Sequence, residues 1–310
     1  WVKSFGGIYP DKGISIGADS LGFIYVSGYF NNEATFGSIT ITAPPNFNTW
    51  GANNKENFIF KMDSLGNVLW AIAGGNQSGN CCDDRALGMH VTPGGDVFIT
   101  GTYWGSWTVY HLGVIGAPGT ITATGANEHD TSLLGKVDKD GNPVWVISFG
   151  GNNTSGGCPW PITDADDHSY DVKVDDDGFI YVTGFFSGFD AEFDGLTITN
   201  SDWDVDCQPM GYIGKLDPNG NWLWVDKFDG IKDQRGSRDN RLAIDEFSNI
   251  YVVGGFQNTA NYGPFSITSN GEWDAFIFKM DKDGNWLWAK NIGSNKTDRA
   301  NSIAVDVCND

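Results

Sequence analysis

Five residue pairs that recur at equivalent places in the chain are the best candidates for a binding site. The second member of each pair is basic and lies seven positions before the residue that ends a short apolar segment. The first member is aspartate in four pairs and serine in one; the pairs are Asp11-Lys12, Asp84-Arg85, Asp167-His168, Ser237-Arg238 and Asp298-Arg299. We expect them to form a charged ring on one face of the fold. Such a ring would either contact a ligand or ion, or hold neighbouring repeats in register through ion pairs.

Acidic residues also gather in turns that resemble the beginning of a calcium-binding loop. Four turns have this form, at residues 138–142, 175–178, 217–220 and 281–285. Their glycine comes too early for the calcium pattern and no glutamate follows at position twelve. A hairpin turn explains them better, because aspartate closes such a turn and glycine takes its positive φ. The denser acidic loop with Asp164, Asp166 and Asp167 is the better cation candidate, and Ca²⁺ is the one cofactor that the sequence suggests.

Tryptophans in the variable parts of the repeats offer a second kind of binding surface. Trp104, Trp107 and Trp160 are expected on loops, where an indole can stack against the apolar face of a sugar ring. The alternative is that these rings pack against the rim of the fold. Trp50, Trp203 and Trp273 each fall shortly before a strongly apolar strand, in three different repeats, which favours packing for them.

Catalysis finds little support in the sequence. The four histidines, His90, His111, His129 and His168, show no H-E-x-x-H or other paired metal spacing, and no G-x-S-x-G sequence occurs. Carboxylates from several repeats could still meet as a glycosidase pair across a central channel. We therefore expect a non-catalytic protein and keep a carbohydrate-active one as the alternative.

Charge and cysteine content exclude several classes of partner. The formal net charge is −20 and the pI is about 4.3, a field that repels phosphate backbones, so no nucleic-acid partner is expected. No window of ~18 apolar residues occurs, and we expect no membrane insertion by this segment. The five cysteines form no C-x-x-C pair and fall in loops, which suits an oxidising compartment; their pairing stays open: Cys81, Cys82, Cys158, Cys207 and Cys308.

Internal repeats must position all of these residues. A turn followed by a tryptophan recurs along the chain, with Trp1, Trp70, Trp145, Trp224 and Trp288 spaced 69, 75, 79 and 64 residues apart. Four full repeats follow, at about residues 8–75, 76–151, 152–230 and 231–293. Partial repeats stand at residues 1–7 and 294–310, so we expect the chain to be a segment of a longer protein.

Each repeat is predicted to contain four main strands and one small extra strand. Apolar and β-branched runs alternate with Asp/Gly turns, and no helical period of useful length occurs, so the fold class is all-β. The short first strands are expected at residues 14–18, 86–91, 170–174, 242–244 and 302–305. The small strands are expected at residues 34–42, 119–124, 191–199 and 262–268. Because one such sheet buries a single face, we expect the sheets to stack radially as a single-domain β-propeller over residues 1–310.

The pattern of these repeats is similar to a known family. The sequences G-N-x-x-W, I-A-V-D, I-Y-V-T-G-x-F, F-G-x-x-x-I-T and F-I-x-K-x-D together resemble the SBBP-type β-propeller repeats of bacterial surface and secreted proteins, in the long form common in Bacteroidota. The resemblance covers essentially the whole chain. It implies an exported protein whose propeller, with at least five blades, acts in adhesion, recognition or scaffolding, and it brings no catalytic residues.

The sequence therefore predicts an extracellular, cell-surface or secreted module. Its expected partners are a protein or glycan ligand, or neighbouring domains of the same large surface protein. The variable segment of each repeat differs strongly between repeats, which favours recognition over a purely structural role.

Overall fold

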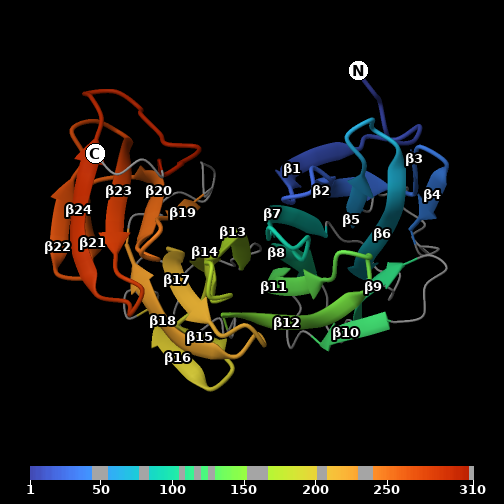
Figure 1. Ribbon diagram of the computed structural model, residues 1–310. Helices are drawn as coiled ribbons and strands as arrows, with labels where there is room; N and C mark the ends of the chain where they lie inside the picture. Colours follow the sequence, from blue (N-terminus) through green and yellow to red (C-terminus); the bar gives the residue numbers. More distant parts are fainter. Residues whose placement is uncertain are drawn as a thin grey trace, which may run out of the picture. The chain divides into compact units, whose positions relative to one another are not determined.

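The computed structural model describes residues 1–43, 55–76, 84–104, 109–114, 120–124, 130–151, 167–200, 208–229 and 240–306. These parts consist of strands and turns, and no helix among them is long and apolar enough to span a membrane. The chain divides into two compact units, residues 1–148 and 149–310, close to the predicted boundary between the second and third repeats. Each unit contains antiparallel sheets (Figure 1).

Unit 1 holds the first two repeats. The first repeat forms four strands in chain order: β1 Lys12–Ala18, β2 Ile24–Asn31, β5 Lys55–Met62 and β6 Val68–Asn76. The second repeat forms β7 Arg85–Val91, β8 Val97–Trp104, β11 Asp130–Val137 and β12 Pro143–Gly151, the last of which reaches into unit 2. Each of these two sheets has six strands, because the hairpin inserted in the next repeat pairs with its tryptophan strand, β6 or β12. Two hairpins are inserted after β2 and β8: β3 Glu33–Phe36 with β4 Ile39–Thr42, and β9 Val109–Val114 with β10 Thr120–Thr124.

Unit 2 repeats this plan. Its third-repeat sheet is β13 His168–Val174, β14 Ile180–Phe186, β17 Met210–Leu216 and β18 Trp222–Phe228. Its fourth-repeat sheet is β19 Arg241–Ile244, β20 Ile250–Phe256, β23 Asp274–Met280 and β24 Trp286–Ile292. The inserted hairpins are β15 Asp190–Phe193 with β16 Leu196–Thr199, and β21 Thr259–Tyr262 with β22 Phe265–Thr268.

The four main strands of every full repeat are confirmed, with the tryptophan strand last. Two details of the prediction are wrong. The extra element is a two-stranded hairpin in each repeat. In the first, third and fourth repeats a glycine turns the chain between its two strands: Gly37, Gly195 and Gly263 have φ of 63°, 86° and 55°. Residues 302–305 form no strand, because a first strand pairs with the second strand of its own repeat and the described residues hold no such strand after residue 305.

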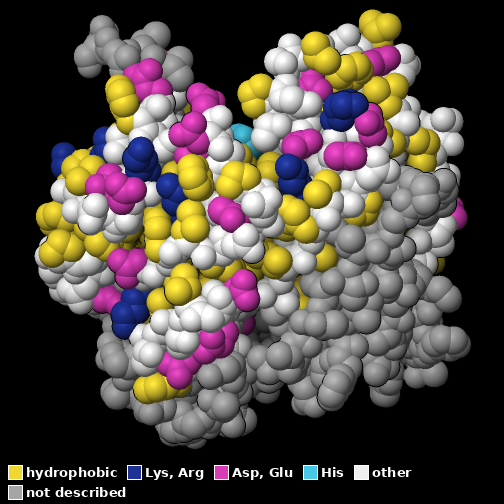
Figure 2. Space-filling view, turned by 60° about the horizontal axis from the view of Figure 1, so that its bottom comes forward, with side chains coloured by type: hydrophobic (Ala, Val, Ile, Leu, Met, Phe, Trp, Pro, Cys, Tyr) yellow, Lys and Arg dark blue, Asp and Glu magenta, His cyan; other side chains and the backbone are white. Residues whose placement is uncertain are grey.

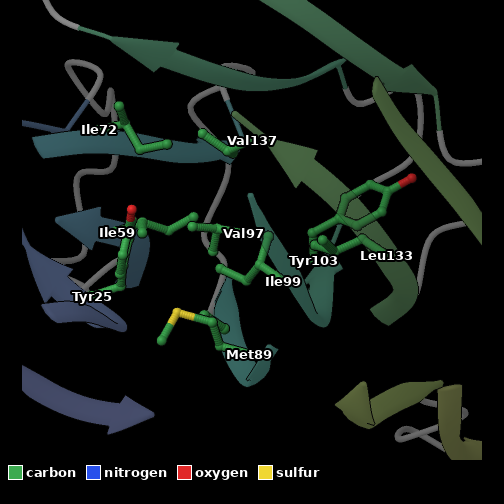
Figure 3. Packing of buried hydrophobic residues seen from close by; sticks show 10 residues of the cluster. Tyr25, Ile59, Ile72, Met89, Val97, Ile99, Tyr103, Leu133 and Val137 are labelled. Atoms are coloured by element: carbon green, nitrogen blue, oxygen red, sulfur yellow. The ribbon is translucent and has the colours of Figure 1, made fainter. Parts of the chain in front are cut away.

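The core of unit 1 lies between its two sheets. Tyr25, Ile59 and Ile72 from the first sheet meet Met89 and Val97 from the second, and all are buried (Figure 3). The first strands of the two repeats, β1 and β7, lie next to each other. This packing confirms the expectation that neighbouring repeats bury the apolar faces of their sheets against one another.

A β-bulge follows the start of the first strand in three repeats, and it explains the glycine in the I-Y-V-T-G-x-F sequence. The pairing register shifts after Gly13, Ala86 and Ser169. A glycine of the second strand lies opposite each bulge. The carbonyl oxygen of the residue before the bulge occupies the place where the Cβ atom of any other residue would lie. A Cβ atom built on Gly28, Gly101 or Gly184 would lie 2.0, 1.9 or 2.0 Å from that oxygen. Glycine is required there for close backbone approach.

Candidate functional site

The aspartates of the predicted ring bind backbone amides. Asp11 accepts hydrogen bonds from the amide of Gly7 at 2.6 Å and from that of Asn31 at 3.1 Å. Gly7 lies six residues after the tryptophan of the preceding repeat, and Asn31 ends β2. In unit 2 the Asp167 carboxylate makes the equivalent bonds to Gly151 and Ser187, at 2.7 and 2.9 Å. The carboxylate thus ties the tail of one tryptophan strand to the second strand of the next repeat.

Asp298 shares half of this arrangement. Its carboxylate accepts from the Ser294 amide at 2.7 Å and from the Ser294 hydroxyl at 2.8 Å. Ser294 also lies six residues after a tryptophan, Trp288. Asp11 and Asp167 therefore hold neighbouring repeats in register through amide hydrogen bonds, which charge on the carboxylate strengthens, whereas the bonds of Asp298 are local.

Asp84 has a different neighbour, the carboxyl group of Glu56 on β5. Asp84 is 1% exposed and Glu56 is 2% exposed. A Cβ atom on Gly75 would lie 1.3 Å from Glu56 Oε2 and 3.0 Å from Asp84 Oδ2, so both carboxyl groups converge on this glycine. Burial raises the pKa of Glu56 to about 9, and the negative charge of Asp84 adds to the shift. Glu56 is therefore protonated at neutral pH.

The basic members of the pairs have unlike surroundings. Lys12 is exposed, His168 stacks on Phe185 with ring centroids 5.0 Å apart, and Arg299 lies over the Trp273 ring at 4.9 Å. Arg85 is half-buried at the start of β7. Arg238, like Ser237, lies outside the described residues. The charged ring as a ligand site stays a prediction.

The other predicted site residues fall mostly outside the described part. Trp107, Trp160, Asp164 and Asp166 lie outside it, as does the side chain of Trp104. Asp167 is described, and its two oxygens serve the amide bonds given above. Within the described residues no group of three or more histidine, cysteine or acidic side chains could hold a metal ion. Figure 2 shows acidic side chains dispersed among basic and hydrophobic ones on the face in view.

The Asp-rich turns have the predicted hairpin chemistry. Asp63 accepts hydrogen bonds from the amides of Leu65 and Asn67 and from the Asn67 side chain, at 2.8–2.9 Å. The same three bonds close the turn at Asp217. The hydrogen bonds from Asn67 lower the pKa of Asp63. Aspartate, glycine and asparagine are each used within the turn, which accounts for the recurring D-x-x-G-N sequence.

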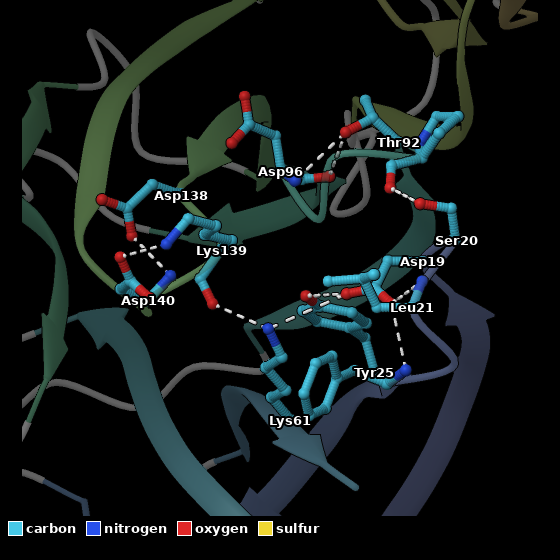
Figure 4. A network of polar contacts seen from close by, with 12 residues as sticks. Asp19, Ser20, Leu21, Tyr25, Lys61, Thr92, Asp96, Asp138, Lys139 and Asp140 are labelled. Carbon is cyan, nitrogen blue, oxygen red and sulfur yellow. Dashed lines mark hydrogen bonds and ion pairs between the residues drawn. The ribbon is translucent and has the colours of Figure 1, made fainter. Parts of the chain in front are cut away.

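A lysine cluster that the sequence reasoning missed connects consecutive repeats. Lys61 Nζ donates to the carbonyl oxygen of Lys139, in the next repeat, at 3.1 Å, and lies 3.8 Å from Asp19 Oδ2 (Figure 4). It also lies over the Tyr25 ring, at 4.9 Å, and the Tyr25 hydroxyl donates to Asp19 at 3.0 Å. Trp70 Nε1 donates to the same Lys139 oxygen at 3.2 Å. The Lys139 carbonyl oxygen therefore accepts hydrogen bonds from both the lysine and the indole of the preceding repeat.

Parts of the cluster recur in the third and fourth repeats. Lys215 Nζ donates to the carbonyl oxygen of Lys282 at 3.0 Å, and Tyr181 donates to Asp175 at 3.0 Å. Lys279 lies 3.6 Å from Asp245. The signal was present in the sequence, as the lysine of every F-I-x-K-x-D strand, but its role depends on a turn almost 80 residues away in the chain.

We expect Lys61→Met to lower the free energy of unfolding by about 1–2 kcal/mol, because it removes a buried charged donor shared by two repeats. Lys139→Met is the matched control, since the Lys139 side chain is 59% exposed and pairs with Asp140 on the surface. The control should cost less than about 0.5 kcal/mol. Urea unfolding followed by tryptophan fluorescence measures both. Equal effects would contradict a role for the Lys61 ammonium between repeats.

A pocket of about 190 Å³ in unit 1 lies beside the first residue pair. Asp11 and Lys12 line it, together with Gly13 and Val26 and with four aromatic rings: Phe5, Phe36, Phe58 and Phe60. Both Asp11 oxygens are used by amides, whereas Lys12 is exposed. The pocket thus combines apolar walls with one cationic group, which suits a small ligand with a flat apolar part.

Comparison with known proteins gives a distant relative. No protein-family model matches the sequence. An uncharacterized WD repeat-containing protein, L264 of Acanthamoeba polyphaga mimivirus, is 26% identical over 326 residues, covering 94% of this chain and 23% of that protein. The chain therefore spans less than a quarter of this relative. A solved structure, a protein of unknown function from Bacteroides caccae, aligns at 12% identity and a TM-score of 0.36, covering 94% of this chain and 89% of that one. The repeat-containing relative agrees with the all-β repeats described above.

Proposed function

We propose that the four sheets are blades of a β-propeller that acts as a non-catalytic recognition or scaffold module of a secreted or cell-surface bacterial protein. Three features support this proposal: each repeat is one antiparallel meander with its tryptophan strand last, the sheets of unit 1 stack face to face, and the relative is a WD repeat-containing protein. The resemblance of the repeats to the SBBP type supports the extracellular location.

The observation that carries the non-catalytic role is the use made of the aspartates. Asp11 and Asp167 give both carboxylate oxygens to backbone amides, and Asp63 and Asp217 close turns. These groups are structural ligands of the main chain and are not presented to a substrate. Recognition then falls to the segments inserted after the second strand, which differ in sequence from repeat to repeat.

The proposal is tested by binding measurements on the 310-residue chain. We expect it to bind an extracellular protein or a glycan when screened against panels of both, and to lose that binding when residues 105–108 and 125–129 are replaced by Gly/Ser of equal length. The Lys139→Met variant is the control and should keep full binding. Detection of the native protein on unpermeabilised cells or in the medium is the second expected result. Retention inside the cell would contradict the surface assignment.

A carbohydrate-active propeller is the second candidate, favoured by the tryptophans of the variable segments in the sequence and by the aromatic-walled pocket at Asp11 and Lys12. It predicts release of reducing ends from a polysaccharide, and loss of that activity on Trp107→Ala or Trp160→Ala. Sugar binding without release would support recognition instead.

A further inference from the structure

Each inserted hairpin lies on the tail of the tryptophan strand of the preceding repeat. The contact residue is always the fifth after the tryptophan. Gly6 and Thr35 exchange two backbone hydrogen bonds of 3.1 Å. Gly150 pairs with Glu192 on β15, and the Asp229 amide donates to the carbonyl oxygen of Asn261 on β21 at 3.0 Å. In the second repeat, β9 pairs along residues 72–76 of β6.

An aromatic contact accompanies this backbone contact in three of the four cases. The residue that follows the bridging position on the hairpin is Phe36, Phe193 or Tyr262, and each is at most 2% exposed. Its ring meets the fourth residue after the preceding tryptophan: Phe36 lies 6.2 Å from Phe5, Phe193 lies 5.6 Å from Phe149, and Tyr262 lies 6.0 Å from Phe228. Phe149 and Phe228 are 4% and 1% exposed as a result.

The last tryptophan strand, β24, has the equivalent two positions, but no described hairpin covers them. Ile292 is the fourth residue after Trp288 and is 59% exposed, and Gly293, at the bridging position, is also exposed. Among the described residues β24 pairs with β23 alone. The bond from Ser294 to Asp298 is nevertheless in place, as at the occupied sites. The end of β24 therefore keeps this hydrogen bond of the occupied sites. Gly293 differs from Gly6 and Gly150, which have φ of 133° and 145°, and its carbonyl oxygen accepts from Asn270 Nδ2 at 3.5 Å.

We propose that the exposed tail at Ile292 and Gly293 is a docking site for a β-hairpin whose first strand carries Ala-x-Phe/Tyr, supplied by a further repeat of this type. Backbone hydrogen bonds to Gly293 would extend the strand, and the aromatic ring would cover Ile292. A second copy of this chain is not the occupant, because its own described hairpins at β3, β9, β15 and β21 already lie on a preceding strand. This inference does not depend on the proposed recognition function.

The probe is a backbone-cyclised peptide with the sequence of residues 190–199, DAEFDGLTIT, titrated into the ¹⁵N-labelled 310-residue chain. We expect saturable chemical-shift changes centred on Ile292, Gly293 and Ser294. Ile292→Phe should tighten binding by roughly threefold to tenfold, because it restores the aromatic pair. Ile292→Asp should abolish binding, and its exposed position leaves the fold intact. Leu287→Asp, 43% exposed at the start of the same strand, is the matched control and should bind as the parent does.

Three results would overturn the proposal. They are absence of binding at millimolar peptide, binding that Ile292→Asp leaves unchanged, and equal binding of a peptide in which the phenylalanine is replaced by alanine. Sedimentation velocity tests the other possible occupant, which is a second copy of this chain. Self-association of the chain that disappears in Ile292→Asp would assign the site to a second copy and reject the hairpin of a further repeat.

Discussion

Replacing Gly184 with alanine is expected to lower the free energy of unfolding by about 3 kcal/mol or more. The added Cβ would lie 2.0 Å from the carbonyl oxygen of His168 and 2.7 Å from the Tyr212 hydroxyl. The His168 carbonyl belongs to the bulged start of β13, and Asp167 immediately before it is fixed by two amide hydrogen bonds. The obstructing atom is therefore main chain held from both sides, and it cannot rotate away as a side chain would.

Gly195→Ala is the matched control for this prediction. Gly195 has a φ of 86°, so alanine is strained there, but nothing lies within 4 Å of the new Cβ. We expect a loss of about 1 kcal/mol, the conformational part alone. Urea unfolding of both variants, followed by tryptophan fluorescence, gives the comparison. A cost at Gly184 no larger than that at Gly195 would show that the β13 carbonyl yields and that the bulge does not fix this glycine.

Glu56→Gln is expected to raise the free energy of unfolding at pH 8 by about 2–4 kcal/mol. Burial and the Asp84 charge raise the pKa of Glu56 to about 9 in the folded protein, against 4.5 for the ordinary group. Between these values the folded state binds one more proton than the unfolded state. Its stability therefore falls as the pH rises, with full stability below pH 4.5. Glutamine is neutral at every pH and removes this dependence.

The measurement is chemical unfolding at several pH values from 5 to 9. The parent protein should lose stability steadily across that range, while Glu56→Gln should show a flatter profile. Glu192→Gln is the control, since Glu192 is exposed on β15 and should leave the slope of the parent unchanged. Parallel slopes for the parent and Glu56→Gln would mean that the buried Glu56 carboxyl is ionised at neutral pH.

Local pattern was sufficient to predict the strands but not what surrounds them. The alternation of apolar residues in sequences such as FIYVSGYF is enough for a strand, and the tryptophan period identifies the repeat. The inserted element was predicted as one strand over residues 34–42, because Gly37 was not read as the turn that splits it into β3 and β4. Turn glycines inside short apolar runs are the signal that would have found it.

The site was harder to predict, because its contacts join distant parts of the chain. Asp11 and Asp167 stand out in the sequence as recurring residues. Their partners are backbone amides, and a sequence of side chains does not show which amide a carboxylate binds. Glu56 attracts no notice in the sequence, because its neighbours Gly75 and Asp84 lie 19 and 28 residues away in the chain. Lys61 recurs in every repeat, but its acceptor is a backbone carbonyl in the next one.

The carbonyl oxygen of Lys139 has a consequence for how such a chain can change in length. It accepts hydrogen bonds from the Lys61 ammonium and the Trp70 indole. The carbonyl oxygen of Ser64 likewise accepts one from the Trp1 indole, at 2.9 Å. Serine and lysine serve equally because the accepting atom is main chain, so the side chain there is free to mutate. Lys215 makes the equivalent bond to the carbonyl oxygen of Lys282 in the fourth repeat, so the acceptor turn recurs in the first, second and fourth repeats. Duplication of a whole repeat by unequal recombination would therefore bring along both halves of its own attachment, and the new unit would fit between its neighbours without further substitutions.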